Sequence, residues 1–264
     1  MKTFSFTKMH GLGNDFIVVN NMTQALQLTP AETQRLAHRH LGIGCDQVLL
    51  IEKSKEADFF CRILNADGSE AEQCGNGLRC VARFIKDKGL STNTEFTVAT
   101  KAGIFPVVIR DNDHIQVTMS VPVFAEPISV VFEGISTPLV TLSMGNPHAI
   151  MIVPSIEMVP VAEIGDILNQ HPAFPEGVNV GFVEKIDARH ILLRTFERGV
   201  GETYACGSNA CAAAVAGMQH WDLESQVKVG LVFGNLSIAC AGNDEPVIMT
   251  GPASWVFEGE FSLA

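Results

Sequence analysis

Two cysteines each stand directly before a run of small residues, a pattern that suits acid–base chemistry. Cys74 lies in N-A-D-G-S-E-A-E-Q-C-G-N-G-L-R-C, and Cys206 precedes G-S-N-A. If each run opens a helix, free backbone N–H groups and the positive end of the helix dipole meet beside the sulfur. We expect this position to lower the pKa of both thiols and to seat a substrate carboxylate.

Two such thiols can invert a stereocentre when they face one carbon atom from opposite sides. One thiolate removes the α-hydrogen of an amino acid, and the opposite thiol returns a proton to the other face. The helix amides then stabilise the carbanion-like transition state through the carboxylate, and water has to be excluded. The residues alone therefore predict a racemase or epimerase.

The two halves of the chain resemble each other at a fixed offset of 132 residues, which is the separation of the two cysteines (206 − 74). The matches include small polar residues in loop-like positions, where similarity of cores does not explain them. They are Gly13-Asn14 with Gly145-Asn146, Gln47 with Asn179, Arg62 with Arg194, Asn65 with Glu197, and Glu70 with Glu202. We interpret this as an internal duplication, against the alternative of chance similarity between two β-rich halves.

For the other polar residues, a structural role is an alternative to a functional one. His148, after Asn146-Pro147, is as well explained as a structural histidine. Adjacent Glu197 and Arg198 suit a surface ion pair. Gln47 and Asn179 can cap turns, although their correspondence favours binding. A buried structural role fits the remaining cysteines, which are Cys45, Cys61, Cys80, Cys211 and Cys240.

Composition narrows the class of protein. The 264 residues are 47% hydrophobic and carry a net charge of −11, which disfavours nucleic acid and anionic membranes as partners. An odd cysteine count without an export signal indicates reduced thiols, so we expect a cytoplasmic protein. No cysteine spacing matches a zinc site. The lone G-x-G at Gly11 lacks the third glycine of a dinucleotide motif.

The local patterns predict many short strands and few helices. A capping box at Thr29 with Pro30 opens a helix that we expect Gly42 to close. A second helix is predicted from Asn76 to Lys88, and a third, apolar on all sides, after Cys206. The strands are predicted at 16–19, 48–52, 59–64, 104–110, 115–119, 191–196, 247–250 and 255–257.

These elements predict a mixed α+β (α/β) protein of two pseudo-symmetric domains. Each domain is a curved sheet wrapped around a central helix, with the active site in the cleft between them. The proline-containing segment Ser120–Pro127 is the candidate linker. We therefore expect an N-terminal half at 1–119, to which residues 252–264 return, and a C-terminal half at 120–251.

At this level the sequence resembles the diaminopimelate epimerases over essentially its whole length. The resemblance is carried by G-L-G-N-D-F at Gly11, C-G-N-G-L-R-C at Cys74, G-N-P-H at Gly145, E-R-G-V-G-E-T-Y-A-C-G-S at Glu197 and G-P-A-S-W-V-F-E-G-E near the C-terminus. Proline racemases typically have histidine where this chain has Asn76, and the phenazine-type isomerases do not use the cysteine pair.

The resemblance implies an epimerase without cofactor or metal that interconverts LL- and meso-2,6-diaminopimelate in lysine and peptidoglycan-precursor biosynthesis. It implies Cys74 and Cys206 as the acid/base pair, tuned by His148 and Glu197. The implied substrate-binding residues are Asn14, Gln47, Asn65, Gly75, Asn76, Asn146, Asn179, Glu197, Arg198, Gly207 and Ser208. Among these, Asn65, Asn179 and Arg198 would hold the distal carboxylate.

Two departures from the family pattern bear on the expectations. Asn209 stands where many members have glycine, and Phe257 stands where several have tyrosine in a segment linked to dimerisation. A homodimer is still expected. The competing hypotheses are a thiol-based redox sensor, a non-catalytic amino-acid-binding protein and a pyridoxal-phosphate racemase. Turnover of diaminopimelate by the reduced, colourless protein would separate them from the epimerase.

Overall fold

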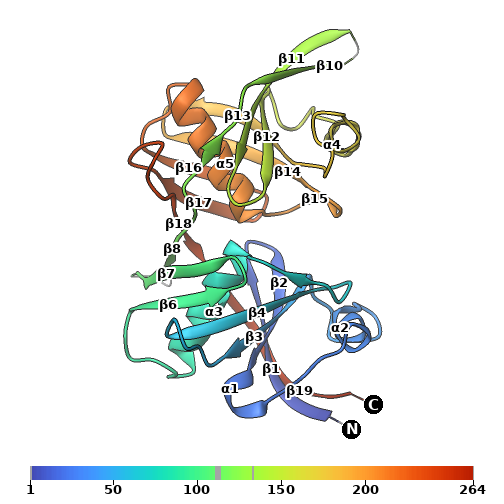
Figure 1. Ribbon diagram of the computed structural model, residues 1–264, viewed down its shortest axis with the longest axis vertical. Helices are drawn as coiled ribbons and strands as arrows, with labels where there is room; N and C mark the ends of the chain where they lie inside the picture. The colour runs from blue at the N-terminus through green and yellow to red at the C-terminus, as the bar shows by residue number, and fades with distance from the viewer. Residues whose placement is uncertain (1, 111–113, 133, 264) are drawn as a thin grey trace. The chain divides into compact units, whose positions relative to one another are not determined.

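A computed structural model describes residues 2–110, 114–132 and 134–263 (Figure 1). The chain forms two compact units, Met1–Val117 with Gly251–Ala264 (unit 1) and Thr118–Thr250 (unit 2). Both units are sheets with few helices, which confirms the predicted mixed α/β class. None of the helices among the described residues is long and apolar enough to cross a membrane.

Unit 1 is a sheet in the order β19-β1-β2-β3-β4-β6-β7-β8, in which the β2–β3 and β4–β6 pairs are parallel. The short β5 extends β4. Its elements are β1 (Lys2–Gly11), β2 (Asn14–Asn20), α1 (Asn21–Gln24), α2 (Pro30–Ala37), β3 (Gln47–Glu52), β4 (Phe59–Asn65), β5 (Glu70–Ala71), α3 (Gly75–Asp87), β6 (Glu95–Thr100), β7 (Gly103–Ile109), β8 (His114–Thr118) and β19 (Ser254–Leu263).

Unit 2 repeats this order as β9-β11-β12-β13-β14-β16-β17-β18, with β12–β13 and β14–β16 parallel. β10 pairs with β11, and β15 extends β14. Its elements are β9 (Val123–Phe124), β10 (Ile128–Phe132), β11 (Ile135–Ser143), β12 (Pro147–Ile152), α4 (Val161–Asn169), β13 (Asn179–Asp187), β14 (His190–Glu197), β15 (Gly201–Thr203), α5 (Gly207–His220), β16 (Gln226–Leu231), β17 (Gly234–Ala239) and β18 (Ile248–Pro252).

The strand registers repeat at the offset found in the sequence. The pair Phe16–Gln47 in unit 1 corresponds to His148–Asn179 in unit 2, and Leu64–Glu70 corresponds to Phe196–Glu202. After the central helices the offset becomes 131, because β6 starts at residue 95 and β16 at residue 226 (226 − 95). These registers support the duplication.

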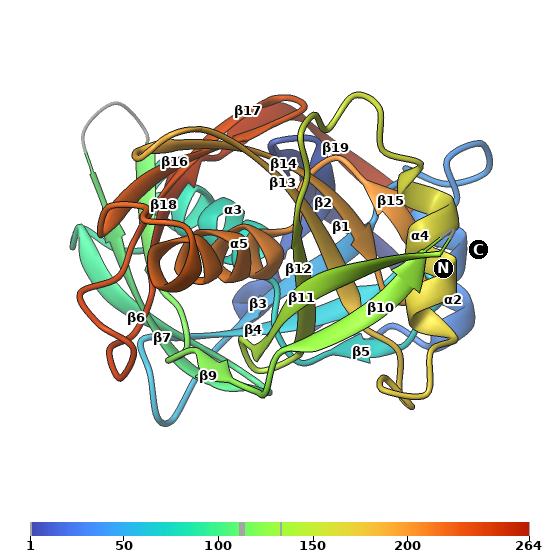
Figure 2. The same cartoon turned by 90° about the horizontal axis from the view of Figure 1, so that it is seen from above.

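A helix lies against the concave side of the sheet in each unit. α3 packs on β1, β2, β3 and β7, and α5 lies among β11–β14, β16 and β17 (Figure 2). The buried residues Leu78, Val81 and Ile85 recur at helical spacing on α3. α5 is buried on all sides between Asn209 and Gly217, as its apolar composition predicts.

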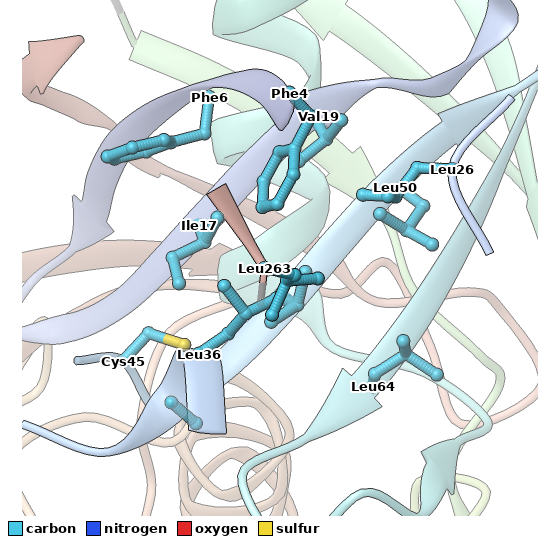
Figure 3. Packing of buried hydrophobic residues seen from close by; sticks show 12 residues of the cluster. Phe4, Phe6, Ile17, Val19, Leu26, Leu36, Cys45, Leu50, Leu64 and Leu263 are labelled. Atoms are coloured by element: carbon cyan, nitrogen blue, oxygen red, sulfur yellow. The ribbon is translucent and has the colours of Figure 1, made fainter. Parts of the chain in front are cut away.

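In each unit a second core lies between the opposite face of the sheet and a peripheral helix, which is α2 in unit 1 and α4 in unit 2. In unit 1 it gathers Leu36 of α2 with Ile17, Val19 and Leu50, and Leu263 of β19 closes it (Figure 3). The corresponding core of unit 2 is built from Val130, Leu139, Ala149, Met151, Val161, Leu168, Val178, Val180, Phe182 and Phe196. Two cores per unit fix each sheet from both faces.

The predicted end of the first helix is wrong. Thr29 and Glu32 form the complete capping box, but α2 ends at Ala37 and does not reach Gly42. His38 takes an extended backbone, and its Nδ1 accepts hydrogen bonds from the N–H groups of His40 and Leu41, both at 3.1 Å. This side-chain turn ends the helix before the glycine. The predicted linker Ser120–Pro127 contains β9, which pairs with β11.

Candidate active site

Cys74 is the N-cap residue of α3, as its sequence position predicts. Its backbone is extended (φ −148°), its sulfur accepts the N–H of Gly77 at 3.3 Å, and its carbonyl accepts the N–H of Leu78. Gly75 and Asn76 are buried in the first turn. The amide groups at this helix start can therefore stabilise a thiolate or a carboxylate.

Asn14 connects β2 to this helix start. Its Oδ1 lies 3.8 Å from the Cys74 sulfur, which donates to it, and 3.2 Å from Nδ2 of Asn76. Gly13 precedes it with φ +93°, a left-handed turn that favours glycine. The predicted residues Asn14, Cys74 and Asn76 thus form one cluster.

Gln47 and Asn65 form a second polar pair in unit 1, at the neighbouring strand ends. They are directly opposite in the β3–β4 register, and Nε2 of Gln47 donates to Oδ1 of Asn65 at 2.8 Å. Asn65 in turn donates to Ser69 Oγ at 2.9 Å. Oδ1 of Asn65 therefore has a hydrogen-bond donor. Oε1 of Gln47 is buried and has no hydrogen-bond partner among the described residues.

Cys206 is the N-cap residue of α5 and is buried. Its sulfur lies 3.5 Å from Ser208 Oγ. The expected fall in its pKa is wrong: burial raises the pKa of the Cys206 thiol well above its usual range, and the nearby Glu197 carboxylate adds to the effect. Hydrogen bonds from Ser208 and from the Asn209 backbone oppose the rise but do not cancel it. Cys206 is therefore a protonated thiol at neutral pH.

His148 is buried at the start of β12, and its Nε2 lies 3.0 Å from Oδ1 of Asn146. Burial lowers the pKa of the imidazole to about 4; Arg198 adds to this, and the side chain of Asn209 acts in the opposite direction. His148 is accordingly neutral near pH 7. His148 and Asn146 therefore form a cluster of predicted residues in unit 2.

Asn179 and Arg198 lie at adjoining strand ends in unit 2. Asn179 Nδ2 donates to the carbonyl of Pro147 at 3.2 Å, and its Oδ1 accepts the backbone N–H of Arg198 at 3.0 Å. The Arg198 side chain is exposed and donates to the carbonyl of Glu176 at 3.1 Å. Asn179 therefore shapes this edge, while Arg198 carries a positive charge to it.

Three residues of these clusters were not among the predicted site residues. Asp46 accepts a hydrogen bond from Asn14, Thr203 donates to Glu197 at 2.5 Å, and Asn209 donates to the carbonyl of Val180 at 2.9 Å. Asp46 directly precedes Gln47, and Thr203 lies between Glu197 and Cys206, so nearness in sequence was the available signal. The five cysteines assigned a structural role are buried, as predicted.

The sequence and the fold are both similar to known proteins. The sequence profile described as diaminopimelate epimerase matches residues 6–125 and 140–256. The diaminopimelate epimerases of Nitrosomonas europaea and Nitrosospira multiformis are 48% and 45% identical to this chain, each over 98% of both proteins.

Among solved structures, a Bacillus anthracis phenazine biosynthesis protein of the PhzF family has a TM-score of 0.78 at 21% identity, covering 100% of both chains. A hydroxyproline epimerase from Agrobacterium vitis has a TM-score of 0.74 at 16% identity, covering 98% of this chain and 92% of that one. At these identities the two structures establish the shared fold alone. The sequence relatives go further, and by them this chain belongs to the diaminopimelate epimerase family.

Proposed function

We propose that this protein interconverts LL- and meso-2,6-diaminopimelate without a cofactor, in lysine and peptidoglycan-precursor biosynthesis, with Cys74 and Cys206 as the acid/base pair. Family membership supports the reaction. The observation that carries the mechanism is that both thiols occupy the N-cap of a buried central helix, at equivalent positions of two duplicated units.

In the proposed mechanism, the two units bind one substrate so that the thiols address opposite faces of its α-carbon. The protonated Cys206 delivers a proton in one direction while Cys74 removes the α-hydrogen, and the roles exchange in the reverse direction. The helix starts at Gly75-Asn76 and Gly207-Ser208 stabilise the α-carboxylate as negative charge develops on it.

The remaining site residues give the substrate its orientation. Arg198, with Asn65 and Asn179, binds the distal carboxylate, since a guanidinium suits a carboxylate and Arg198 is exposed at the edge. Asn14, Gln47, Asn146 and Glu197 complete the pocket. Glu197 and His148 tune the second thiol: the carboxylate raises the pKa of Cys206, and the neutral imidazole holds Asn146.

Solvent isotope exchange tests the reaction. The reduced protein, without pyridoxal phosphate, should incorporate one deuterium at the α-carbon of diaminopimelate in D2O while interconverting the LL and meso forms.

Cys74→Ala and Cys206→Ala should each abolish epimerisation, whereas Cys240→Ala, which removes a cysteine outside both helix starts, should retain it. Near-normal turnover in either helix-start variant would exclude the two-thiol mechanism.

A homodimer and a cytoplasmic location belong to the same proposal. Val256 and Phe257 on β19 are 52% and 47% exposed, which supports an association surface there. Light scattering on the purified chain should give twice the 28.5 kDa of one copy. A monomer at micromolar concentration would contradict the dimer.

A further inference from the structure

We propose that Asp46 is a positioning residue that fixes the side-chain amide of Asn14 so that its oxygen, and not its nitrogen, faces Cys74. This inference rests on the proposed function, because Cys74 is the thiol on which Asn14 acts. Nδ2 of Asn14 donates to Oδ2 of Asp46 at 2.9 Å. An ionised carboxylate only accepts hydrogen bonds, so the amide nitrogen has to point toward Asp46.

The orientation of Asn14 determines what it offers to the sulfur. With its nitrogen on Asp46, its oxygen accepts from Asn76 Nδ2 at 3.2 Å and from the Cys74 sulfur at 3.8 Å. An acceptor beside the sulfur stabilises the proton that Cys74 gains when it acts as base. The reversed amide would present N–H donors and stabilise the thiolate instead.

Asp46 is itself held by a network of charges. Its Oδ2 also accepts the Asp15 N–H at 3.1 Å, and its Oδ1 accepts Arg39 Nη2 at 2.7 Å. Arg39 makes two 2.9 Å bonds to the Asp15 carboxylate, and Lys8 contacts the same carboxylate at 2.5 Å and the carbonyl of Gly44. Both oxygens of Asp46 are thus engaged, Oδ2 by Asn14 and the Asp15 N–H and Oδ1 by Arg39.

The carboxylate of Asp15 is ionised, so the ion pairs around Asp46 stay charged. Burial raises the pKa of Asp15, but hydrogen bonds and charge from Arg39 and Lys8 outweigh it and bring the pKa to about 2. The carboxylate is therefore ionised throughout the pH range in which a thiol reaction is measured. Arg39 stays paired, and its bond to Asp46 persists with it.

Among the described residues of unit 2, no carboxylate occupies the position that Asp46 has in unit 1. Position 178, at the duplication offset from Asp46, is the buried Val178, and Asn146 is contacted through its oxygen by His148 at 3.0 Å. Asn14 is therefore held through the nitrogen as well as the oxygen of its amide, whereas Asn146 contacts His148 through its oxygen. The acceptor beside the second thiol is the Glu197 carboxylate instead, whose charge and hydrogen bond raise the pKa of Cys206.

A double-mutant cycle tests the assignment. Asp46→Ala should lower kcat at least about tenfold with little change in KM, because Asn14 loses its fixed orientation. In the Asn14→Ala background, the same change should alter kcat less than about twofold. Equal losses in both backgrounds would show that Asp46 does not act through Asn14 and would overturn the proposal.

Glu52→Ala is the matched control. Glu52 also accepts from one arginine and one asparagine of unit 1, Arg62 and Asn21, but neither belongs to the site. Its loss should reduce the free energy of unfolding about as much as Asp46→Ala does and leave kcat within about twofold. A tenfold fall in kcat for Glu52→Ala would mean that any lost ion pair has this effect, which overturns the assignment.

A readout without substrate separates this proposal from the proposed function. In a Cys206→Ser background, the pH profile of Cys74 alkylation by iodoacetamide should move to lower pH on Asp46→Ala, as the amide turns its donors to the sulfur. The shift should vanish with Asn14→Ala. An unmoved profile overturns the positioning role even if diaminopimelate is epimerised. A moved profile supports that role even if the protein proves inactive on diaminopimelate.

Discussion

Phe16 and His148 occupy the same position in the two units. Phe16 is opposite Gln47 in the parallel β2–β3 register, and His148 is opposite Asn179 in the parallel β12–β13 register. Both side chains are buried, at 0% and 1% exposure. One strand position therefore carries an apolar ring in the first half and a titratable ring, which contacts Asn146, in the second.

The burial of His148 makes stability depend on pH. The native pKa is about 4, against about 6.5 in the unfolded chain, so below about pH 6.5 the unfolded state binds a proton that the native state does not. This contribution to stability is therefore lost as pH falls from about 6.5 to about 4, up to roughly 3 kcal/mol. Urea unfolding between pH 7.5 and 4.5 should show a shallower loss for His148→Phe, which copies unit 1.

Proton NMR of the imidazoles supplies the control for this prediction. The chain has eight histidines, and the resonance missing from the His148→Phe spectrum identifies His148. The chemical shift of that resonance should remain that of a neutral imidazole down to about pH 4. Titration of His148 near 6.5 would contradict both the buried neutral imidazole and the pH dependence derived from it.

The pKa of Cys206 should respond in opposite directions to two neighbouring substitutions. Burial is the largest cause of its rise, Glu197 adds to it, and the Ser208 hydroxyl opposes it. In a Cys74→Ser background, Glu197→Gln should move the pH profile of Cys206 alkylation to lower pH, and Ser208→Ala should move it higher. Gln can still accept the hydrogen bond of Thr203, so the first variant removes the charge and keeps that contact. Shifts of the same sign in both variants would contradict this account.

The helices show what local patterns can and cannot predict. α3 and α5 follow from a small-residue start and, for α3, an apolar periodicity, and their predicted positions agree with the structure. The start of α2 follows from its capping box, but its end depends on the His38 side chain. The sequence patterns do not predict α4, which begins at Val161 after the N-cap residue Pro160 and has no side-chain cap, although moving α2 by the duplication offset would indicate it.

In the site, too, the residues repeated in both halves can be predicted from the sequence, whereas those that depend on tertiary contacts cannot. The cysteines and their asparagines stand out because each half repeats them. Asp46 and Thr203 have Val178 and Ala71 as counterparts, so comparison of the halves passes over them. The pKa of Cys206 was predicted in the wrong direction because a helix start is visible in sequence, whereas burial depends on the whole unit.

Two equivalent arginines should differ in their effect on stability. Arg62 pairs with Glu70 and Arg194 with Glu202, but Arg194 also donates to the carbonyls of Ile156 and Val159 at 2.7 and 3.1 Å. Arg194→Met should therefore cost about 1–3 kcal/mol in urea unfolding. Arg62 has a second carboxylate partner, Glu52, in place of the carbonyls, but its side chain is 41% exposed against 25% for Arg194. Arg62→Met should therefore cost less than about 1 kcal/mol. Equal losses would show that the two carbonyl contacts of Arg194 contribute no more than the exposed Arg62–Glu52 pair.

Gly165 on α4 should resist the alanine that a helix ordinarily favours. Alanine is preferred over glycine in helices by about 1 kcal/mol. Here, however, a Cβ at residue 165 would lie 2.2 Å from the Phe196 ring, which belongs to the core between α4 and the sheet. Gly165→Ala should therefore lower the free energy of unfolding by about 1–3 kcal/mol, because the ring has to leave its packed position. In the Phe196→Ala background the clash is absent, and the same substitution should become neutral or stabilising. Stabilisation in the otherwise unchanged protein would mean that the ring moves without cost and that this second core is not closely packed around it.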